Sequence, residues 1–229
     1  MFFRMSFADN AYKYFTHLEL KHELPAGVEV MNPYKERTVR ECFRAFLKLH
    51  FDDSRKRVLI FGINPSRFGA GITGVAFTDP VALRDFCGVP NAMGDTRELS
   101  STFVYQVVEA MGGAKKFYKD FFLTASCPLG FTKDGVNYNF YDHPDLQRDV
   151  TPFIVRSMKA QIAMGGRTDV AVVLGTGKLM AYLERLNAEH KFFKKLVALE
   201  HPRFIMQYRR KRVPAFVEKY RKVLRDAAR

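Results

Sequence analysis

Cysteine is scarce in this chain, which has only three among its 229 residues: Cys42, Cys87 and Cys127. No two of them form a CxxC pair, and an odd count argues against a disulfide framework. Three thiols in one chain also cannot hold a four-cysteine iron–sulfur cluster. We therefore expect buried free thiols in a reducing compartment.

Long apolar runs are absent as well. No stretch approaches the roughly 18 uncharged apolar residues that a membrane-spanning helix needs. The first residues also lack the apolar run of roughly 7–15 residues that marks a signal peptide. We therefore expect a cytoplasmic protein with no membrane partner.

The familiar nucleotide and metal signatures are incomplete. Gly175-Thr176-Gly177-Lys178 follows an apolar run, but Val172 and Met180 stand where the Walker and GxGxxG patterns require glycine. This segment predicts the N-terminus of a helix, which is either a simple turn or a contact for a DNA phosphate. Four residues in polar loops could suggest a metal: Asp79, Asp142, His143 and Asp145. Their irregular spacing favours solvated turns, so we expect neither a metal nor an organic cofactor.

Positive charge, by contrast, is abundant. The chain has 37 Lys and Arg against 24 Asp and Glu, a net charge of +13. The 39 residues from Lys191 onward hold 13 basic and 3 acidic residues, so most of the excess lies there. Such an excess favours a polyanionic partner, either nucleic acid or an anionic membrane face. An unspecialised basic surface is the alternative.

The apolar pattern predicts an α/β fold. Four apolar runs predict strands, at 58–61, 121–125, 170–174 and 196–199. Apolar residues at helical spacing predict helices over 6–22 and 36–50, from about residues 144 and 178, and over 214–224. Strands alternating with helices predict a mainly parallel four-stranded sheet inside a three-layer α/β/α sandwich. We expect one domain over 1–229, of which 1–55 form an N-terminal helical part.

The loop after the first strand, residues 62–80, carries the richest chemical signal. It presents Asn64 at a strand end, and Pro65 fixes the turn beyond it. An amide can orient a water molecule through its oxygen, although it is a poor general base. The alternative is an asparagine that merely caps a glycine-rich turn.

A second polar loop is expected over residues 201–208, after the fourth strand. A neutral His201 could donate a hydrogen bond to an oxygen that gains charge as a leaving group departs. The basic run that follows could hold phosphates, and it comprises Arg209, Arg210, Lys211 and Arg212. Three side chains could enter a groove and fill the gap left by an extruded base: Met206, Gln207 and Tyr208. A structural histidine beside a solvated basic face is the alternative.

Three segments of the chain, which follow one another in the same order as in the family, resemble the single-strand-selective monofunctional uracil-DNA glycosylases of the uracil-DNA glycosylase superfamily. The first segment is similar to the family motif Gly-Met-Asn-Pro-Gly-Pro-Phe-Gly, followed by Thr-Gly-Val-Pro-Phe. The residues that match it are Gly62, Asn64, Pro65, Phe68, Gly69, Thr73, Gly74, Val75 and Phe77. A middle Cys-Pro-Leu matches at residues 127–129, and a final His-Pro at residues 201–202. Residues before about 55 contribute nothing to the resemblance.

The resemblance implies a DNA glycosylase with a role for each matched residue. Asn64 would hold the attacking water, His201 would donate to uracil O2, and Phe77 would stack on the flipped base. The base-binding set implied is Gly62, Ile63, Phe68, Phe77, Ala125 and Ser126. The DNA-binding set expected is Ser66, Arg67, Gly175, Lys178, Arg203, Met206, Gln207, Tyr208, Arg209, Arg210, Lys211 and Arg212. No amine is expected to form a covalent intermediate, so the enzyme would be monofunctional.

Two departures from the family pattern affect specificity. The family has an asparagine that reads the edge of uracil where this chain has Ala125, between Thr124 and Ser126. After the final His-Pro, the family continues Ser-Pro-Arg-Asn, whereas residues 203–206 here are Arg-Phe-Ile-Met. The pattern is closer to the bacterial second branch of the family, for which related deaminated or oxidised bases such as xanthine are plausible substrates. Strict uracil specificity therefore does not follow from the sequence.

Together these observations predict a monomeric, monofunctional DNA glycosylase that removes uracil or a related base in base excision repair. Its partner would be single- or double-stranded DNA, and its place the bacterial cytoplasm, on the nucleoid during repair. A non-catalytic nucleic-acid-binding module on the same fold is the first alternative, which Ala125 and the altered final motif favour. A hydrolase of free nucleosides is the second, which the basic C-terminal region disfavours.

Overall fold

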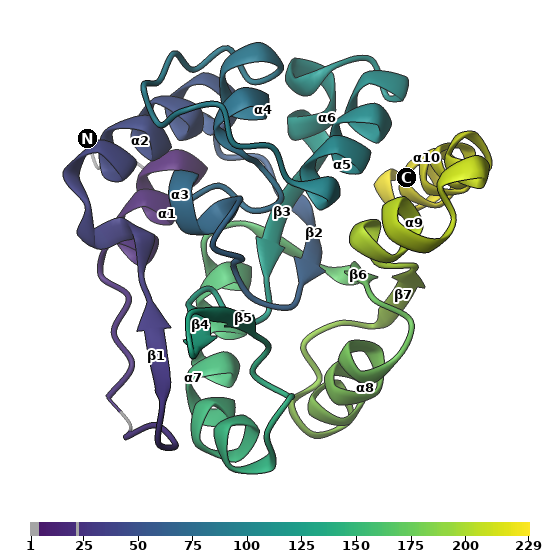
Figure 1. Ribbon diagram of the computed structural model, residues 1–229. Helices are drawn as coiled ribbons and strands as arrows, with labels where there is room; N and C mark the ends of the chain where they lie inside the picture. Colours follow the sequence, from purple (N-terminus) through teal and green to yellow (C-terminus); the bar gives the residue numbers. More distant parts are fainter. Residues whose placement is uncertain (1–4, 22) are drawn as a thin grey trace.

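The computed structural model describes residues 5–21 and 23–229, and its centre is a four-stranded parallel sheet (Figure 1). The strands are β2 (Arg57–Gly62), β3 (Phe121–Ala125), β6 (Gly166–Leu174) and β7 (Lys195–Leu199). Their order is β3-β2-β6-β7, and all three pairings are parallel. All four strands predicted from the apolar runs are therefore present, and the predicted sheet is confirmed.

Helices cover both faces of this sheet, as side-chain alternation along β3 shows. Leu123 points toward α5 (Leu99–Ala110) and α10 (Val213–Ala228), and it lines a small apolar space with Val104 and Leu224. Neighbouring Thr124 points to the opposite face. There its hydroxyl donates to Gln161 of α7 (Pro144–Ala163) over 2.6 Å. The predicted three-layer α/β/α arrangement is therefore confirmed.

The N-terminal part packs against the same sheet. Helices α1 (Phe7–Thr16) and α2 (Arg37–Phe51) place Phe7 and Phe51 against Phe122 of β3, with ring centroids 5.0 and 5.3 Å apart. The aromatic contacts explain why β3 is buried at every position although it is an edge strand.

A second, antiparallel sheet has the order β1-β4-β5 and was not predicted. Its strands are β1 (Val28–Met31), β4 (Gly130–Lys133) and β5 (Val136–Tyr138). The N-terminal part over 1–55, expected to be helical, contains α1 and α2 but also the strand β1. Most of residues 130–138 likewise belong to this sheet, as β4 and β5. These strands are short and half exposed, so they carry no continuous apolar run.

The remaining elements connect the strands. They are α3 (Ala70–Thr73), α4 (Pro80–Asp85), α6 (Ala114–Asp120), α8 (Lys178–His190), α9 (Pro202–Tyr208), and the 3-10 turns η1 (Pro33–Lys35) and η2 (Arg210–Arg212). Helix α1 ends at Thr16, before the predicted end at residue 22, and His22 lies outside the described residues. Residues 202–208 were expected to be a loop but form α9, because Pro202 suits the first helical position and His201 caps it.

Within the described ranges, no helix is long and apolar enough to cross a membrane. In the same ranges, no group of three or more His, Cys, Asp or Glu side chains could hold a metal ion. All three cysteines are free thiols, and two of them, Cys87 and Cys127, are buried.

A buried arginine at the start of β2 joins four elements. The Arg57 guanidinium donates to both carboxylate oxygens of Asp53, at 2.9 and 3.0 Å, and to the Tyr118 carbonyl at 2.8 Å. It also lies over the Phe7 and Phe51 rings, 5.0 and 4.8 Å from their centroids. A buried charge is tolerated only when it is paired and hydrogen-bonded, and each of these partners meets that need.

Replacing this arginine by an apolar residue should therefore destabilise the fold. We expect Arg57→Met to lower the free energy of unfolding by about 3 kcal/mol, since it removes the buried ion pair with Asp53 and leaves the Tyr118 carbonyl without this donor. Chemical denaturation followed by circular dichroism measures this change. The exposed neighbour Lys56 provides the control, and Lys56→Met should change stability by less than about 0.5 kcal/mol. Equal stability of the two variants would contradict the prediction.

Candidate active site

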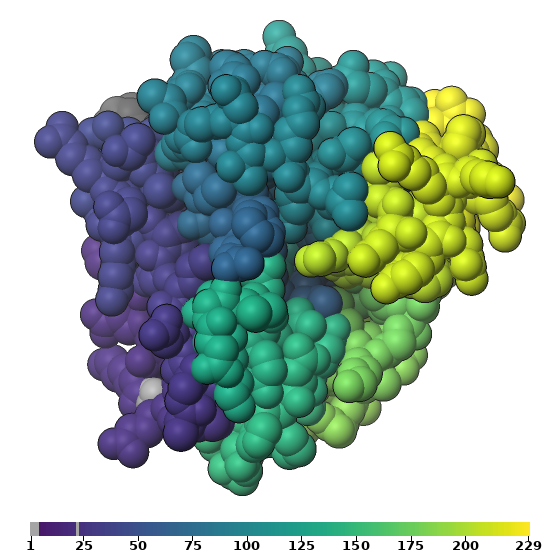
Figure 2. All heavy atoms as spheres, viewed as in Figure 1, coloured from purple at the N-terminus to yellow at the C-terminus, as the bar shows by residue number. Residues whose placement is uncertain are grey.

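A cavity of about 580 Å³ lies at the carboxyl ends of the parallel strands. Figure 2 shows the surface hollowed between the C-terminal residues, in yellow, and the green segment that contains β4 and β5. In open parallel sheets, this edge is where ligands bind. Among the residues expected at the site, those lining the cavity are Gly62, Ile63, Asn64, Ser66, Phe77, Ala125, Gly175, Lys178, His201, Arg203, Gln207 and Tyr208.

The Asn64 side chain is held in one orientation by main-chain groups at the end of β5 and just after it. Its Oδ1 accepts from the Phe140 N–H at 3.2 Å, and its Nδ2 donates to the Tyr138 carbonyl at 3.2 Å. An N–H requires an oxygen and a carbonyl requires an NH₂, so this pair of contacts fixes which end of the amide is which. One lone pair of Oδ1 is then left for another donor.

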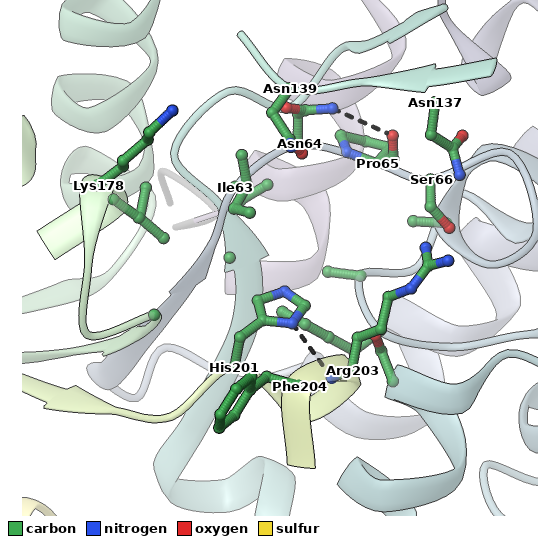
Figure 3. A pocket seen from close by; sticks show the side chains of 18 of the residues that line it. Ile63, Asn64, Pro65, Ser66, Asn137, Asn139, Lys178, His201, Arg203 and Phe204 are labelled. Atoms are coloured by element: carbon green, nitrogen blue, oxygen red, sulfur yellow. Dashed lines mark hydrogen bonds between the residues drawn. The ribbon is translucent and has the colours of Figure 1, made fainter. Parts of the chain in front are cut away.

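His201 lies on the opposite side of the cavity from Asn64 (Figure 3). It caps α9, and its Nδ1 accepts from the Arg203 N–H at 3.1 Å. Burial, assisted by the positive charge of Arg203, lowers the pKa of His201 to about 4. A neutral ring whose Nδ1 is an acceptor carries its proton on Nε2, so the imidazole can donate from that atom.

Phe77 closes one wall of the cavity. Its ring centroid lies 6.1 Å from that of His201, and its φ is +56°, which is uncommon for a bulky residue. The ring packs directly on Gly62, where a Cβ would lie 2.5 Å from it. Only glycine fits at Gly62, and the strained backbone of Phe77 aims its ring at this position.

The floor of the cavity, at the end of β3, has no free polar side chain. Ala125 lines it with a methyl group, and the Thr124 hydroxyl is engaged by Gln161. Ser126 was expected to bind the base, but it is fully buried outside the cavity lining. Its hydroxyl donates to the Gly62 and Ile63 carbonyls, at 3.1 and 3.0 Å, because the ends of β2 and β3 lie side by side there.

Several other expected residues also lie outside the cavity. Phe68, expected to bind the base, is 42% exposed and stacks under the Arg67 guanidinium on the outer surface. Met206, expected in the DNA groove, packs partly buried against the core because α9 turns it inward. The basic run is exposed around η2, beyond the mouth, and comprises Arg209, Arg210, Lys211 and Arg212.

The structure adds lining residues that the sequence did not single out. They include the polar or aromatic residues Glu98, Ser100, Asn137, Asn139, Tyr141, Thr176, Glu200 and Phe204. Burial raises the pKa of Tyr141 to about 12, and the Lys178 ammonium lies 5.9 Å from the centroid of its ring. Two asparagines and three aromatic residues crowd into 137–141, and this density was the one available signal. Glu98 immediately precedes α5, and no motif in the sequence marked it as a site residue.

The exposed side of α9 carries two aromatic residues at the cavity mouth. Phe204 and Tyr208, 41% and 61% exposed, lie one helical turn apart with ring centroids 5.5 Å from each other. The Arg209 guanidinium lies over Phe204, 5.3 Å from the centroid of its ring. The mouth therefore combines aromatic faces with positive charge, a combination that suits nucleic acid.

Comparison with known proteins places this geometry in a family. The family model of the uracil DNA glycosylase superfamily matches residues 49–225. No curated protein sequence matches the chain. Among solved structures, the chain is similar to the wild-type crystal structure of Pedobacter heparinus SMUG2, with 41% sequence identity and a TM-score of 0.94. The match covers 98% of this chain and 99% of that one, so the N-terminal part belongs to the shared fold.

The resemblance seen in the three sequence segments is thus confirmed along the whole chain. The chain belongs to the uracil DNA glycosylase superfamily, within its single-strand-selective monofunctional family, and is a DNA glycosylase, a hydrolase that acts on DNA.

Proposed function

We propose that this protein removes uracil, or a related deaminated or oxidised base, from DNA by hydrolysing the N-glycosidic bond during base excision repair. The observation that carries the proposal is the placement of Asn64 and His201 on opposite sides of one cavity. The similarity to SMUG2 supports it. We further propose that the protein acts as a monomer in the bacterial cytoplasm.

Asn64 supplies the position of the attacking water. The Oδ1 lone pair that Phe140 leaves free accepts a water hydrogen and directs the water oxygen toward C1′ of the deoxyribose. An amide is too weak a base to remove the proton outright, so the water attacks as the glycosidic bond opens. The new C1′–O bond replaces the C1′–N bond, and the water loses a proton to solvent.

His201 stabilises the departing base. The bonding electron pair leaves with the base, which becomes an anion with charge on its carbonyl oxygen. The Nε2–H of the neutral imidazole donates a hydrogen bond to that oxygen. This hydrogen bond becomes stronger as negative charge develops on the oxygen. No amine is needed, so we propose a monofunctional reaction that ends at an abasic site.

The walls determine which base enters. Phe77 offers an aromatic face for stacking, and backbone groups of Gly62 and Ile63 line the adjacent wall. Ala125 offers no hydrogen bond to the Watson–Crick edge, so the floor selects by shape rather than by an amide contact. We therefore propose a range wider than uracil, which includes oxidised or deaminated purines such as xanthine.

DNA contacts surround the mouth. We propose that Lys178, Arg203 and the basic run around η2 bind phosphates, together with Arg67, the Gly175 turn and the main chain at Ser66, whose hydroxyl is held by Glu98. Gln207 and Tyr208, which line the mouth, fill the space that the flipped nucleotide leaves.

The central experiment uses oligonucleotides with a single uracil, xanthine or hypoxanthine, incubated without added metal and then treated with alkali. We expect strand scission by the wild-type protein at uracil and at one or both purines. Binding without scission would reveal a non-catalytic module, and release of uracil from free deoxyuridine alone would reveal a nucleoside hydrolase. Either result would contradict the proposal.

Removing the Asn64 amide should abolish most of the activity. We expect Asn64→Ala to lower the single-turnover rate by about 100-fold or more, because the water loses its fixed position. Asn91→Ala is the matched control, since Asn91 also bonds main-chain groups but lies outside the cavity. Equal rates for the two variants would exclude the proposed role.

The protonation of His201 can be followed directly. Because burial lowers the pKa of His201 to about 4, its imidazole should stay neutral from pH 5.5 to 8, with Nε2 carrying the proton. Nitrogen NMR of histidine-labelled protein, assigned with a His201→Asn variant, measures both properties. A titration midpoint above pH 6, or a proton on Nδ1, would be incompatible with the mechanism.

The contact between Gly62 and Phe77 gives a further prediction. A methyl group at Gly62 would push on the Phe77 ring from 2.5 Å. We expect Gly62→Ala to slow cleavage of uracil-containing DNA by at least about tenfold, since the stacking wall moves into the cavity. Cleavage assays, with circular dichroism to verify folding, test this, and an unchanged rate in the folded variant would refute it.

A further inference from the structure

The turn that follows Asn64 is held between two parts of the protein. On one side, the Asn137 Oδ1 accepts from the Arg67 N–H at 2.9 Å, and Asn64 bonds the main chain of residues 138–140. On the other side, the turn meets a single acidic residue, Glu98, which directly precedes α5. Glu98 lines the cavity, yet neither the water-binding nor the base-stacking role uses it.

Both carboxylate oxygens of Glu98 lie against the turn, and one of them accepts a hydrogen bond from it. The Ser66 hydroxyl donates to Oε1 at 2.5 Å. The other oxygen faces Gly69 so closely that a Cβ at Gly69 would overlap it. The Ser66 carbonyl accepts in turn from the Gly71 N–H at 2.8 Å, so Ser66 connects Glu98 to the whole turn.

Glu98 is itself fixed in place. Its N–H donates to the Asp79 Oδ2 at 2.9 Å, and the Oδ1 of Asp79 caps α4 by accepting from the Ala82 N–H at 2.8 Å. A continuous chain of hydrogen bonds therefore runs from α4 through the start of α5 to Ser66, two residues from Asn64. Burial raises the pKa of Glu98, as expected for a carboxyl turned away from solvent into this contact.

We propose that Glu98 is a positioning residue, which sets the location of Asn64 by holding the turn at Ser66 and Gly69. DNA is a polyanion and repels acidic side chains in a cavity that binds it, and the other carboxylate of the lining, Glu200, is paired with Lys219. A carboxylate in this cavity is therefore better explained by the Ser66 hydroxyl it binds than by contact with DNA. Small displacements of a catalytic group slow reactions strongly, so this grip affects rate more than affinity. The inference rests on the proposed role of Asn64.

The test compares Glu98→Ala, Glu98→Gln, Ser66→Ala and the double variant Glu98→Ala/Ser66→Ala. Glu109→Gln is the matched control, an exposed acid on the same α5 helix. Two quantities are measured on the full chain. They are the single-turnover rate on uracil-containing DNA and the dissociation constant for an oligonucleotide with 2′-fluorinated deoxyuridine, which resists cleavage.

We expect Glu98→Ala to lower the rate by about tenfold or more while the dissociation constant changes by less than about twofold. Glu98→Gln should recover most of the rate, because its amide oxygen still accepts from Ser66. The double variant should be no slower than Glu98→Ala alone, because both changes break one contact. Additive losses, a glutamine variant as slow as the alanine variant, or a change in affinity alone would overturn the proposal.

A readout independent of catalysis separates this inference from the proposed function. Hydrogen exchange of peptides covering residues 66–72 should accelerate in Glu98→Ala and Ser66→Ala but not in Glu109→Gln. If the wild-type protein has no glycosylase activity but exchange is faster in these two variants, the proposed function is refuted and the positioning role of Glu98 stands. Unchanged exchange in a folded Glu98→Ala variant would refute the grip, whatever the activity. If Glu98→Ala fails to fold, the same comparison between Ser66→Ala and Glu109→Gln decides.

Discussion

Two hydrogen bonds orient the Asn64 side chain, one with the last residue of β5 and one with the main chain just beyond it, and the proposed chemistry depends on them. They fix the amide in one orientation and leave one Oδ1 lone pair for another donor. A free asparagine at a strand end would rotate and would hold water at no particular place. The value of this residue therefore comes from a segment more than 70 positions away in the sequence.

The parallel sheet brings the second essential group to the same place. Strands β2 and β7 are separated by β6, and their carboxyl ends deliver Asn64 and His201 to opposite sides of one cavity. The capping geometry at His201 then settles the position of the proton, since Nδ1 is occupied by the Arg203 N–H. Secondary structure thus determines the chemistry of both side chains: a strand end presents the amide, and a helix start sets the tautomer of the imidazole.

The sequence predicted those parts of the molecule that have a strong local pattern. The four strands of the main sheet are continuous apolar runs, and Asn64, Phe77 and His201 stand in recognisable motifs at their ends. It did not predict the small sheet, because β5 has only three residues and its Val136 is 61% exposed. It also misplaced Ser126, whose surroundings depend on how the ends of β2 and β3 meet, and Phe68, which lies exposed beneath Arg67 in the turn after β2. The role of Glu98 could not be predicted for a similar reason, since its partner Ser66 lies 32 residues earlier in the sequence.

The small antiparallel sheet gives the N-terminal part a share in the active site. β1 pairs with β4, β4 pairs with β5, and β5 ends at Tyr138, whose carbonyl holds the Asn64 amide. Loosening the first strand would be transmitted along this ladder to Asn64, the residue proposed to orient the water, although β1 supplies no side chain to the proposed catalytic pair. Under the proposed mechanism, a segment without any recognisable motif therefore affects turnover from a distance, and substitutions in β1 would change the reaction rate without touching the cavity wall.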